Sequence, residues 1–261
     1  MRGRLALLRL DALRLHEQVS EPLVRRLMEE LSSTGLQLDP IIVEEGGTVL
    51  DGAHRVEALR RMGARWAACY LVRYDAEDVK VGTWAWLLAE DPLARARELR
   101  LTKASVGEEA LGRAYLLVRE GELYVPEARA PDAISWRAQL VRAAELLLPH
   151  TCGYVTSQEA ACRARIERMA YLEPRLPGKR AVLELASRQL LLPPKVTRHV
   201  VQGRPLDIRY PLRELMRESP RQLGPLSFRR LPPGSWFRGR FYEEEVLVAV
   251  GDDKGQGAGL P

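Results

Sequence analysis

The sequence has few of the residues that stabilise secreted proteins and none of the segments that span membranes. Its 261 residues include only three cysteines, Cys69, Cys152 and Cys162. Their number is odd and no two are three positions apart, which argues against a disulfide framework or a zinc site and favours a reducing cytoplasm. No run of about eighteen uncharged apolar residues is present, so we expect no transmembrane helix. Arg9 and Asp11 interrupt the first apolar stretch, which argues against a signal peptide.

The net charge of +5 raises the hypothesis of nucleic-acid binding. The basic residues are nearly all arginine, however, and they are spread along the whole chain. The densest basic stretch lies near the C-terminus, at residues 228–230 and 237–240. We interpret this charge as a solvated surface and expect no nucleic-acid partner, because a small anionic ligand fits a basic protein equally well.

The first ninety or so residues predict a compact α/β module. An amphipathic helix begins after Ser20, which can cap it, and ends at Gly35. A second helix follows directly on a short strand and an Asp-Gly pair. A short strand and its exit are predicted at residues 7–15. Further strands are predicted at 40–43, 48–50, 70–72 and 79–81, and helices at 21–34 and 53–62.

The pattern changes after Asp91 and Pro92, where we place a domain boundary. The remainder predicts helices at residues 93–100, 135–148, 157–169 and 178–192, with a hairpin at 115–125. The fold class is therefore α/β, with a second α+β domain. The domains are predicted as 1–92, a nucleotide-binding domain; 93–216, the second domain; and 217–261, a C-terminal extension whose glycine-rich end, 252–261, is expected to be disordered.

One strand-to-helix junction has the composition of a phosphate-binding turn. Gly52 lets the backbone turn closely, and the N–H groups of the following helix point at the turn with the positive end of the helix dipole behind them. His54 and Arg55 add donors for phosphate oxygens, and Asp51 can hold a magnesium ion or assist proton transfer. The alternative is that Asp51 only caps the helix and Arg55 is a surface charge. The turn comprises Leu50, Asp51, Gly52, Ala53, His54 and Arg55.

Residues 52–59 of this turn and helix resemble the signature of the ParB/sulfiredoxin superfamily, whose members bind nucleotide phosphates here. Sulfiredoxins carry a reactive cysteine where this chain has Ala53. ParB partition proteins add a helix-turn-helix domain, and the sequence shows no convincing one. The branch that matches in several separate segments is the free-serine kinase family, so the N-terminal fold implied is ParB/sulfiredoxin-like.

The resemblance to free-serine kinases begins at His16-Glu17-Gln18 and continues through Pro40 and the phosphate turn. Where the family usually has histidine, this chain has Ala53. A second signature matches at 194–200, which contains Lys195, Thr197, Arg198 and His199. The resemblance covers about residues 7–87 and 191–215 and is absent after about 217.

The resemblance implies a site and a reaction. Glu17 would accept the proton of the serine hydroxyl, with Asp51 as the second candidate for that role and as the candidate magnesium ligand. The turn from Leu50 to Arg55 would hold the phosphates of ADP or ATP, and the sequence leaves the choice between these donors open. The residues placed beside the bound serine are Thr83, Trp84, Lys195, Thr197, Arg198 and His199. The product, O-phospho-L-serine, would feed cysteine biosynthesis.

The alternative hypothesis is a ParB-like nucleotide-dependent regulator or DNA-binding protein without serine chemistry. Glu17 and the Thr197-Arg198-His199 run favour the kinase, because a nucleotide switch does not need an amino-acid pocket. A nucleotide module without activity is the third hypothesis. The oligomeric state and the role of the extension are not predicted by the sequence.

Overall fold

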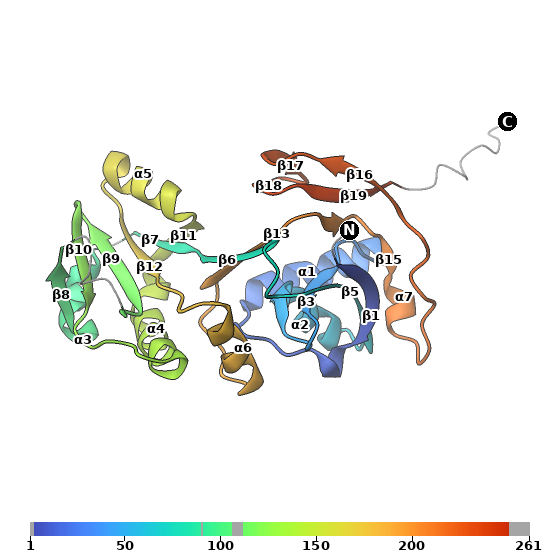
Figure 1. The fold of residues 1–261 in the computed structure, drawn as a ribbon, viewed down its shortest axis with the longest axis horizontal. Coiled ribbons are helices and arrows are strands. Elements are labelled where there is room, and N and C mark those ends of the chain that lie inside the picture. Colours follow the sequence, from blue (N-terminus) through green and yellow to red (C-terminus); the bar gives the residue numbers. More distant parts are fainter. Residues whose placement is uncertain (1–2, 90, 106–111, 251–261) are drawn as a thin grey trace. The chain divides into compact units, whose positions relative to one another are not determined.

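The protein is a mixed α/β structure, which a computed structural model describes over residues 3–89, 91–105 and 112–250 (Figure 1). It divides into two compact units, each built from separate stretches of the chain. Unit 1 comprises Met1–Arg14, Val19–Lys80 and Val200–Pro261, and unit 2 comprises Leu15–Gln18 and Val81–His199. The disorder predicted for residues 252–261 concerns a segment outside the described residues.

This division differs from the contiguous domains expected from the sequence. The chain leaves unit 1 at Lys80 rather than near residue 92, and the segment from Val200 onward belongs to unit 1 instead of forming a separate extension. Strand pairing between distant segments is the physical reason, because β15 (Tyr210–Pro211) pairs with β2 (Leu36–Gln37) and so joins the returning segment to unit 1. Within that segment, β14 (Arg204–Leu206) pairs with β19 (Val246–Val250).

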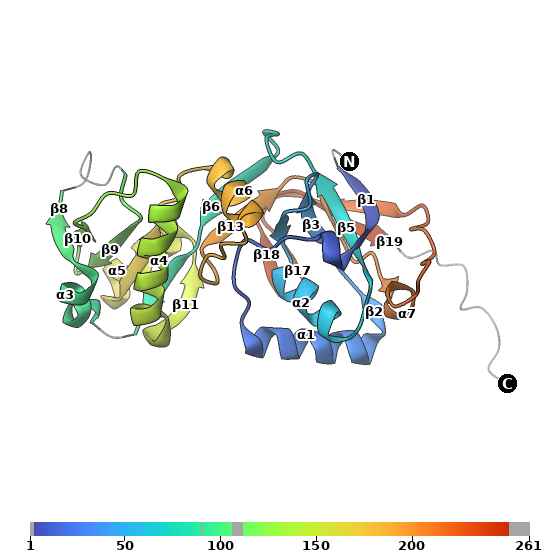
Figure 2. The ribbon, with the colours of Figure 1, turned by 90° about the horizontal axis from the view of Figure 1, so that it is seen from below.

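The core of unit 1 is a four-stranded sheet in the order β1-β5-β3-β4. The β3–β5 pair is parallel and the other two pairs are antiparallel. Residues 41–43 of β3 are all buried, as the apolar run predicted. Helices α1 and α2 lie on one side of this sheet and pack against each other (Figure 2). The elements are β1 (Arg4–Arg9), α1 (Glu21–Thr34), β3 (Ile41–Glu44), β4 (Val49–Asp51), α2 (Ala53–Arg61) and β5 (Trp66–Val72).

The ends of both helices follow from local backbone chemistry. Gly35 takes a left-handed conformation at φ 65°, and its N–H donates to the carbonyl of Leu31 at 2.9 Å, which ends α1. Gly52 precedes α2 at φ 104°, a conformation that other residues rarely adopt. A Cβ atom at position 52 would also approach the Ile41 side chain to 3.3 Å. The sequence-predicted helices of this unit are therefore confirmed, and the turn between β4 and α2 requires its glycine.

Unit 2 is built on a six-stranded antiparallel sheet in the order β11-β7-β12-β9-β10-β8. Alternate residues of β7 (Ala85–Leu88) belong to different cores: Trp86 and Leu88 pack with α4, and Ala85 and Leu87 pack with α5. The sheet is therefore covered by helices on both faces, with α6 on the α4 side (Figure 1). The other elements are β8 (Leu101–Ala104), β9 (Tyr115–Arg119), β10 (Glu122–Pro126), α4 (Ala133–Leu147), β11 (Thr151–Val155), α5 (Ser157–Glu167), β12 (Ala170–Pro174) and α6 (Lys179–Ser187).

Three predicted elements differ from the structure in length or type. The short strand predicted within residues 7–15 begins earlier, at Arg4, and ends at Arg9, where a 3-10 turn forms its exit. The predicted helix at 93–100 is a 3-10 turn joined to a four-residue helix. The predicted helix at 178–192 ends at Ser187, and Gln189 then adopts a left-handed φ of 56°. The short helices are η1 (Leu10–Ala12), η2 (Pro92–Arg95), α3 (Ala96–Leu99), η4 (Leu148–His150) and α7 (Leu212–Leu215).

The C-terminal part of unit 1 contains strands that the sequence did not predict. A three-stranded sheet has the order β14-β19-β16, and β17 and β18 form a hairpin beside it. The hairpin turns at Arg238 and Gly239, both with positive φ, as its two-residue loop requires. Outside this part of the chain, β6, which was predicted at residues 79–81, pairs with β13. The bounds are β6 (Val79–Thr83), β13 (Thr197–Val201), β16 (Ser227–Leu231), β17 (Ser235–Phe237) and β18 (Arg240–Tyr242).

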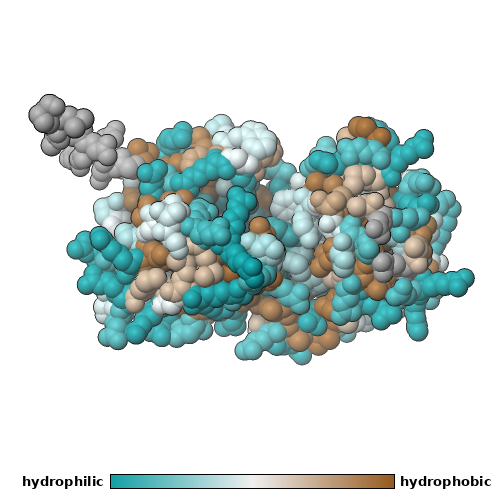
Figure 3. Space-filling view, turned by 180° about the vertical axis from the view of Figure 1, so that it is seen from behind, coloured by the Kyte–Doolittle hydropathy of each residue, from teal (hydrophilic) through white to brown (hydrophobic). Residues whose placement is uncertain are grey.

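The surface gives no sign of a membrane-spanning segment among the described residues. On the face shown in Figure 3, hydrophobic patches are interrupted by hydrophilic side chains. Among the helices described, none combines the length and the apolar character needed to cross a bilayer. All three cysteines are free thiols, with Cys69 buried and the other two exposed.

Candidate active site

The predicted phosphate turn opens onto a cavity in unit 1. The cavity has a volume of about 230 Å³. The turn contributes one wall, and helix α1 contributes the other. The lining residues are Asp51, Gly52, His54 and Arg55 from the turn, and Leu23, Arg26, Leu27 and Glu30 from α1. Leu50 is 4% exposed and belongs to the core, so it supports the turn through its backbone.

Two side chains of the turn are anchored to the backbone of unit 1. The Ser20 N–H donates to Nε2 of His54 at 3.0 Å, which places the proton of the neutral ring on Nδ1. Nη1 of Arg55 donates to the carbonyls of Asp39 and Pro40 at 2.8 and 2.7 Å. These contacts fix the direction of both side chains beside the first turn of α2.

Asp51 is held as a carboxylate by arginines. Nη1 of Arg204 lies 2.6 Å from its Oδ2, and Nη2 of Arg240 lies 3.7 Å from the same oxygen. Burial by itself would raise the pKa of Asp51, but the attraction of Arg204, Arg240 and Arg55 outweighs it and holds the pKa far below its usual range. Such a carboxylate is a weak proton acceptor, so its chemistry suits an ion ligand or a counter-charge better than a general base.

Arg204 is a site residue that the sequence prediction missed. Its side chain is only 2% exposed, and its Nε lies 3.2 Å from Oε1 of the buried Glu244. It therefore bridges the phosphate turn and the C-terminal sheet. The basic stretch that includes Arg240 was visible in the sequence, but we interpreted it as a solvated surface. No local pattern could have paired Arg204 with an aspartate 153 positions earlier, or Arg240 with the same aspartate still farther away in the chain.

The second set of predicted residues meets around Glu17, in unit 2. Thr197 donates to Oε1 of Glu17 from both its N–H and its hydroxyl, the latter at 2.6 Å. The N–H of Lys195 donates to Oε2 at 3.2 Å. Lys195 has a left-handed φ of 61°, and backbone N–H groups around such a residue converge on an anion. The Glu17 carboxylate is thus oriented by three donors.

His16 extends this cluster and was not assigned a role from the sequence. Its Nε2 lies 2.7 Å from the Thr197 hydroxyl and 3.8 Å from Oε1 of Glu17. The ring is 3% exposed and meets the His199 ring edge-on, with the centroids 5.5 Å apart. Since the Thr197 hydroxyl donates to Glu17, it can accept from Nε2–H of His16. We name His16, Glu17, Lys195 and Thr197 the Glu17 cluster.

Two cationic side chains of the second signature lie over the ring of Trp84. The Arg198 guanidinium lies 5.2 Å from the centre of the Trp84 ring, and Nζ of Lys195 lies 5.8 Å from it. The backbone N–H of Trp84 donates to the Val196 carbonyl at 3.2 Å, which ties the backbone of Trp84 to the same segment. Thr83, the last residue of β6, precedes Trp84. The predicted substrate residues of unit 2 are therefore neighbours, although about 110 positions separate the two segments.

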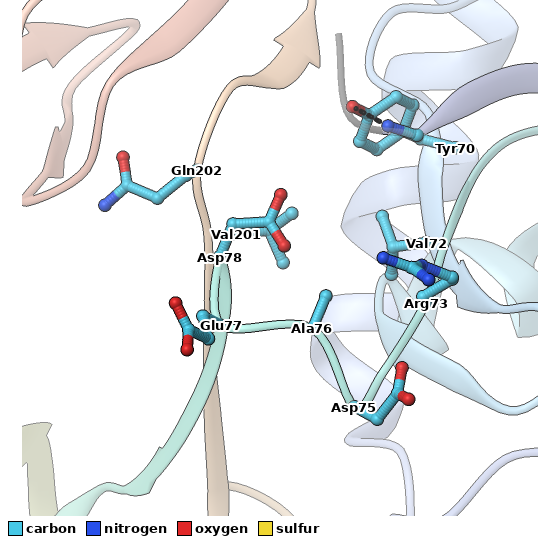
Figure 4. Close-up of a pocket in the computed structure, with 10 residues that line it drawn as sticks. Tyr70, Val72, Arg73, Asp75, Ala76, Glu77, Asp78, Val201 and Gln202 are labelled. Carbon is cyan, nitrogen blue, oxygen red and sulfur yellow. Dashed lines mark hydrogen bonds between the residues drawn. The ribbon is translucent and has the colours of Figure 1, made fainter.

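A larger cavity in unit 1 contains none of the predicted site residues. Its volume is about 620 Å³. Figure 4 shows the carboxylates of Asp75, Glu77 and Asp78 on the segment that leads from β5 to β6. An acidic lining repels phosphates, so this cavity is not a candidate nucleotide site.

The described residues contain no group of three histidine, cysteine, aspartate or glutamate side chains placed to hold a metal ion. Magnesium commonly binds through one or two carboxylates together with substrate phosphates. Asp51 supplies one carboxylate at the phosphate turn, so the residues fit a magnesium ion that arrives with a nucleotide.

The comparisons with solved structures define the fold. The structure matches a free serine kinase variant in complex with AMP with a TM-score of 0.69 and 22% identity, over 82% of this chain and 95% of that one. The protein therefore has the fold of a free serine kinase, as the ParB/sulfiredoxin-like resemblance predicted. No protein-family model matches the chain.

The curated relatives name a more particular class. The chain is 26% identical to the ADP-dependent L-serine kinase of Thermococcus kodakarensis, over 79% of this chain and 90% of that protein. It is 25% identical to the ATP-dependent L-serine kinase of Staphylothermus marinus, over 80% and 90%. A protein of Sulfolobus acidocaldarius described as ParB-like is 29% identical over 72% and 86%. The resemblance to L-serine kinases predicted from the sequence is confirmed.

Proposed function

We propose that this chain is a nucleotide-dependent kinase of free L-serine. The names of the relatives support this function, and one observation of the structure carries it. The Glu17 cluster places a carboxylate against the Thr-Arg-His segment in unit 2, where Trp84 and Arg198 also lie. A nucleotide switch does not require this second set of residues, whereas a kinase of an amino acid does.

The proposed reaction transfers the terminal phosphoryl group to the serine hydroxyl. The hydroxyl oxygen attacks the terminal phosphorus, the bond from that phosphorus to the nucleotide oxygen breaks, and the hydroxyl proton passes to Glu17. The nucleotide leaves one phosphate shorter, as AMP from ADP or as ADP from ATP. Glu17 is the proposed base because Asp51, with its strongly lowered pKa, accepts a proton poorly.

Each remaining residue has a proposed part in binding. Arg198 binds the serine carboxylate through its planar guanidinium, which suits a two-pronged contact. Trp84 forms the wall that positions this side chain. The phosphate turn holds the donor through the N–H groups at the start of α2. The other proposed serine contacts are Thr83, Lys195, Thr197 and His199.

Magnesium is the proposed metal ion, and Asp51 is the residue that would hold it. When bound, such an ion neutralises charge on the phosphates during transfer. The described residues supply too few ligands to hold it alone, so binding of the ion should depend on the nucleotide.

The proposed place of the reaction is the cytoplasm, where O-phospho-L-serine would enter cysteine biosynthesis. The proposed division of roles gives nucleotide binding to unit 1, which contains the phosphate turn, and serine binding to unit 2, which contains the Glu17 cluster and Trp84. The ParB-like relative supports the alternative function, a nucleotide-dependent regulator or DNA-binding protein without serine chemistry.

A thermal-shift panel separates the two functions. The protein is melted with ADP, ATP or CTP, with L-serine or D-serine, and with duplex DNA. The kinase proposal expects stabilisation by ADP or ATP and a further increase with L-serine but not with D-serine. Stabilisation by CTP and DNA, with no response to L-serine, would support the regulator instead.

A further inference from the structure

The hairpin formed by β17 and β18 reaches the phosphate turn, although the sequence signatures of the kinases were found only as far as about residue 215. Arg240, the first residue of β18, lies 3.7 Å from the carboxylate of Asp51, which lines the cavity of the turn. Its neighbour Arg238 contacts the carboxylates of Asp207 and Asp39. The hairpin therefore contacts the turn through Arg240, and Arg238 attaches it to two other aspartates of unit 1.

Arg204 and Arg240, the two arginines that contact Asp51, differ in burial and in the number of carboxylates that they contact. Arg204 is 2% exposed and lies between Asp51 and Glu244, with nitrogen–oxygen distances of 2.6 and 3.2 Å. Arg240 is 50% exposed, makes the longer contact, and lies over the Tyr242 ring at 5.0 Å. Arg204 is thus a buried structural partner of Asp51, whereas the Arg240 side chain remains accessible to solvent.

The charges show what the second arginine at Asp51 adds. Asp51 and Glu244 carry two negative charges, and Arg204 and Arg55 supply two positive charges. Arg240 therefore gives this group a net positive charge beside a cavity proposed to receive phosphates, and its guanidinium can donate two parallel hydrogen bonds to a phosphate.

The side chains of the turn itself cannot easily replace it. Nη1 of Arg55 already donates to two carbonyls, and Nε2 of His54 accepts from Ser20. The hairpin that carries Arg240 is rigid, because its two-residue turn fits the twist of the strands and Phe237 packs against the apolar cluster of the C-terminal sheet.

We propose that the C-terminal hairpin is part of the nucleotide site, where Arg240 binds the β- or γ-phosphate of a nucleoside di- or triphosphate. This inference rests on the proposed function in taking the turn as the donor site. Arg240 then distinguishes donor from product when ADP is the donor: AMP has lost the phosphate that Arg240 contacts, and it leaves the site more readily.

The test compares nucleotide affinities without serine, in the presence of magnesium. Isothermal titration calorimetry measures ADP and AMP binding to the full chain and to Arg240→Gln, Arg240→Lys and Arg229→Gln. Arg229 is an exposed arginine of β16 and is the matched control for the loss of one positive charge. Melting temperatures show that each variant is folded.

We expect Arg240→Gln to weaken ADP binding about tenfold or more, the scale of a lost hydrogen bond to a charged group, and to change AMP binding less than about threefold. Arg240→Lys should recover part of the ADP affinity, and Arg229→Gln should alter neither ligand. Equal losses for ADP and AMP, or an equal effect of Arg240→Gln and Arg229→Gln, would overturn the inference. If Arg240→Gln does not fold, Arg240→Lys replaces it as the test. Its ammonium cannot form the two-pronged contact, so an unchanged ADP affinity in Arg240→Lys would overturn the inference.

The outcomes separate this inference from the function proposed above. Selective loss of ADP binding in Arg240→Gln, in a protein that makes no phosphoserine, would retain the inference and reject the kinase. If the wild-type protein forms phosphoserine and the Arg240→Gln variant binds ADP with unchanged affinity, the kinase is retained and the inference about Arg240 is rejected. A wild-type protein that binds neither nucleotide would contradict both.

Discussion

The hydroxyl of Thr197 donates a 2.6 Å hydrogen bond to Oε1 of Glu17, although 180 positions separate the two residues in the chain. Both belong to unit 2, because residues 15–18 lie with 81–199 rather than with the helix that follows them. The same hydroxyl lies 2.7 Å from Nε2 of His16. This threonine therefore orients the proposed base through a contact that is independent of the phosphate turn.

Replacing Thr197 with valine should lower kcat about tenfold, because Glu17 loses a charge-assisted hydrogen bond that fixes its direction. The dissociation constant for the nucleotide should stay within about twofold. Steady-state kinetics and calorimetry measure the two quantities. Thr197→Ser, which keeps the hydroxyl, is the control and should retain most of the activity. Equal activity in the serine and valine variants would show that the hydroxyl does not act on Glu17.

Glu17→Gln should reduce turnover about a hundredfold or more, the usual scale for a positioned general base. Its effect on nucleotide affinity should be small. The melting temperature should fall modestly, because the amide nitrogen cannot accept the hydrogen bond that Oε2 now accepts from Lys195. Near wild-type turnover would remove Glu17 as the base and leave Asp51 as the next candidate.

Arg198→Lys should raise the KM for serine more than the KM for the nucleotide. Lysine keeps the charge but cannot form a planar two-pronged contact with a carboxylate, and it stacks less well on Trp84. Initial rates over a grid of serine and nucleotide concentrations measure both constants. A similar rise in both would indicate that Arg198 contacts phosphate or only supports the fold.

Asp51→Asn should destabilise the protein in a pH-dependent way. The pKa of Asp51 is lowered in the folded protein, so the ionised carboxylate stabilises the fold at every pH above the ordinary value of about 3.9. This contribution is lost progressively as the pH falls below that value. The gap in melting temperature between wild type and variant should therefore be constant from about pH 5 to 8 and narrow in more acidic buffer.

Melting curves across that range test the prediction for Asp51. Asp11→Asn is the matched control, since Asp11 pairs with Arg9 in an exposed ion pair that contributes little to stability. A gap that grows in acid would show that the arginines do not hold Asp51 as a carboxylate.

Local patterns predicted the parts of the fold that depend on neighbouring residues. The apolar run at residues 41–43 and the glycine at position 52 specify a buried strand and a strand-to-helix turn by themselves. The two groups of candidate site residues were likewise proposed from short signatures. What the sequence could not predict depends on long-range pairing: the placement of residues 15–18 in unit 2 and the return of residues 200–250 to unit 1.

Arg204 and Arg240 are two further residues whose importance could not be predicted from local sequence patterns. Arg204 has no local neighbour that marks it as a site residue, and its importance comes from Asp51 and Glu244, which β4 and the C-terminal segment bring to it. Arg240 lies in a stretch whose composition is that of an ordinary exposed hairpin. Only the tertiary structure distinguishes it from Arg229, which faces solvent on the neighbouring sheet.

Formation of O-phospho-L-serine is the most direct test of the central proposal. The purified protein is incubated with L-serine, magnesium and either ADP or ATP, and phosphorus NMR follows the phosphoserine and nucleotide signals over time, with Glu17→Gln in parallel. We expect phosphoserine and the shortened nucleotide in equal amounts from the wild-type protein, and about a hundredfold slower formation of phosphoserine from the variant. If the wild-type protein forms no phosphoserine with either nucleotide, the proposed serine kinase activity is contradicted.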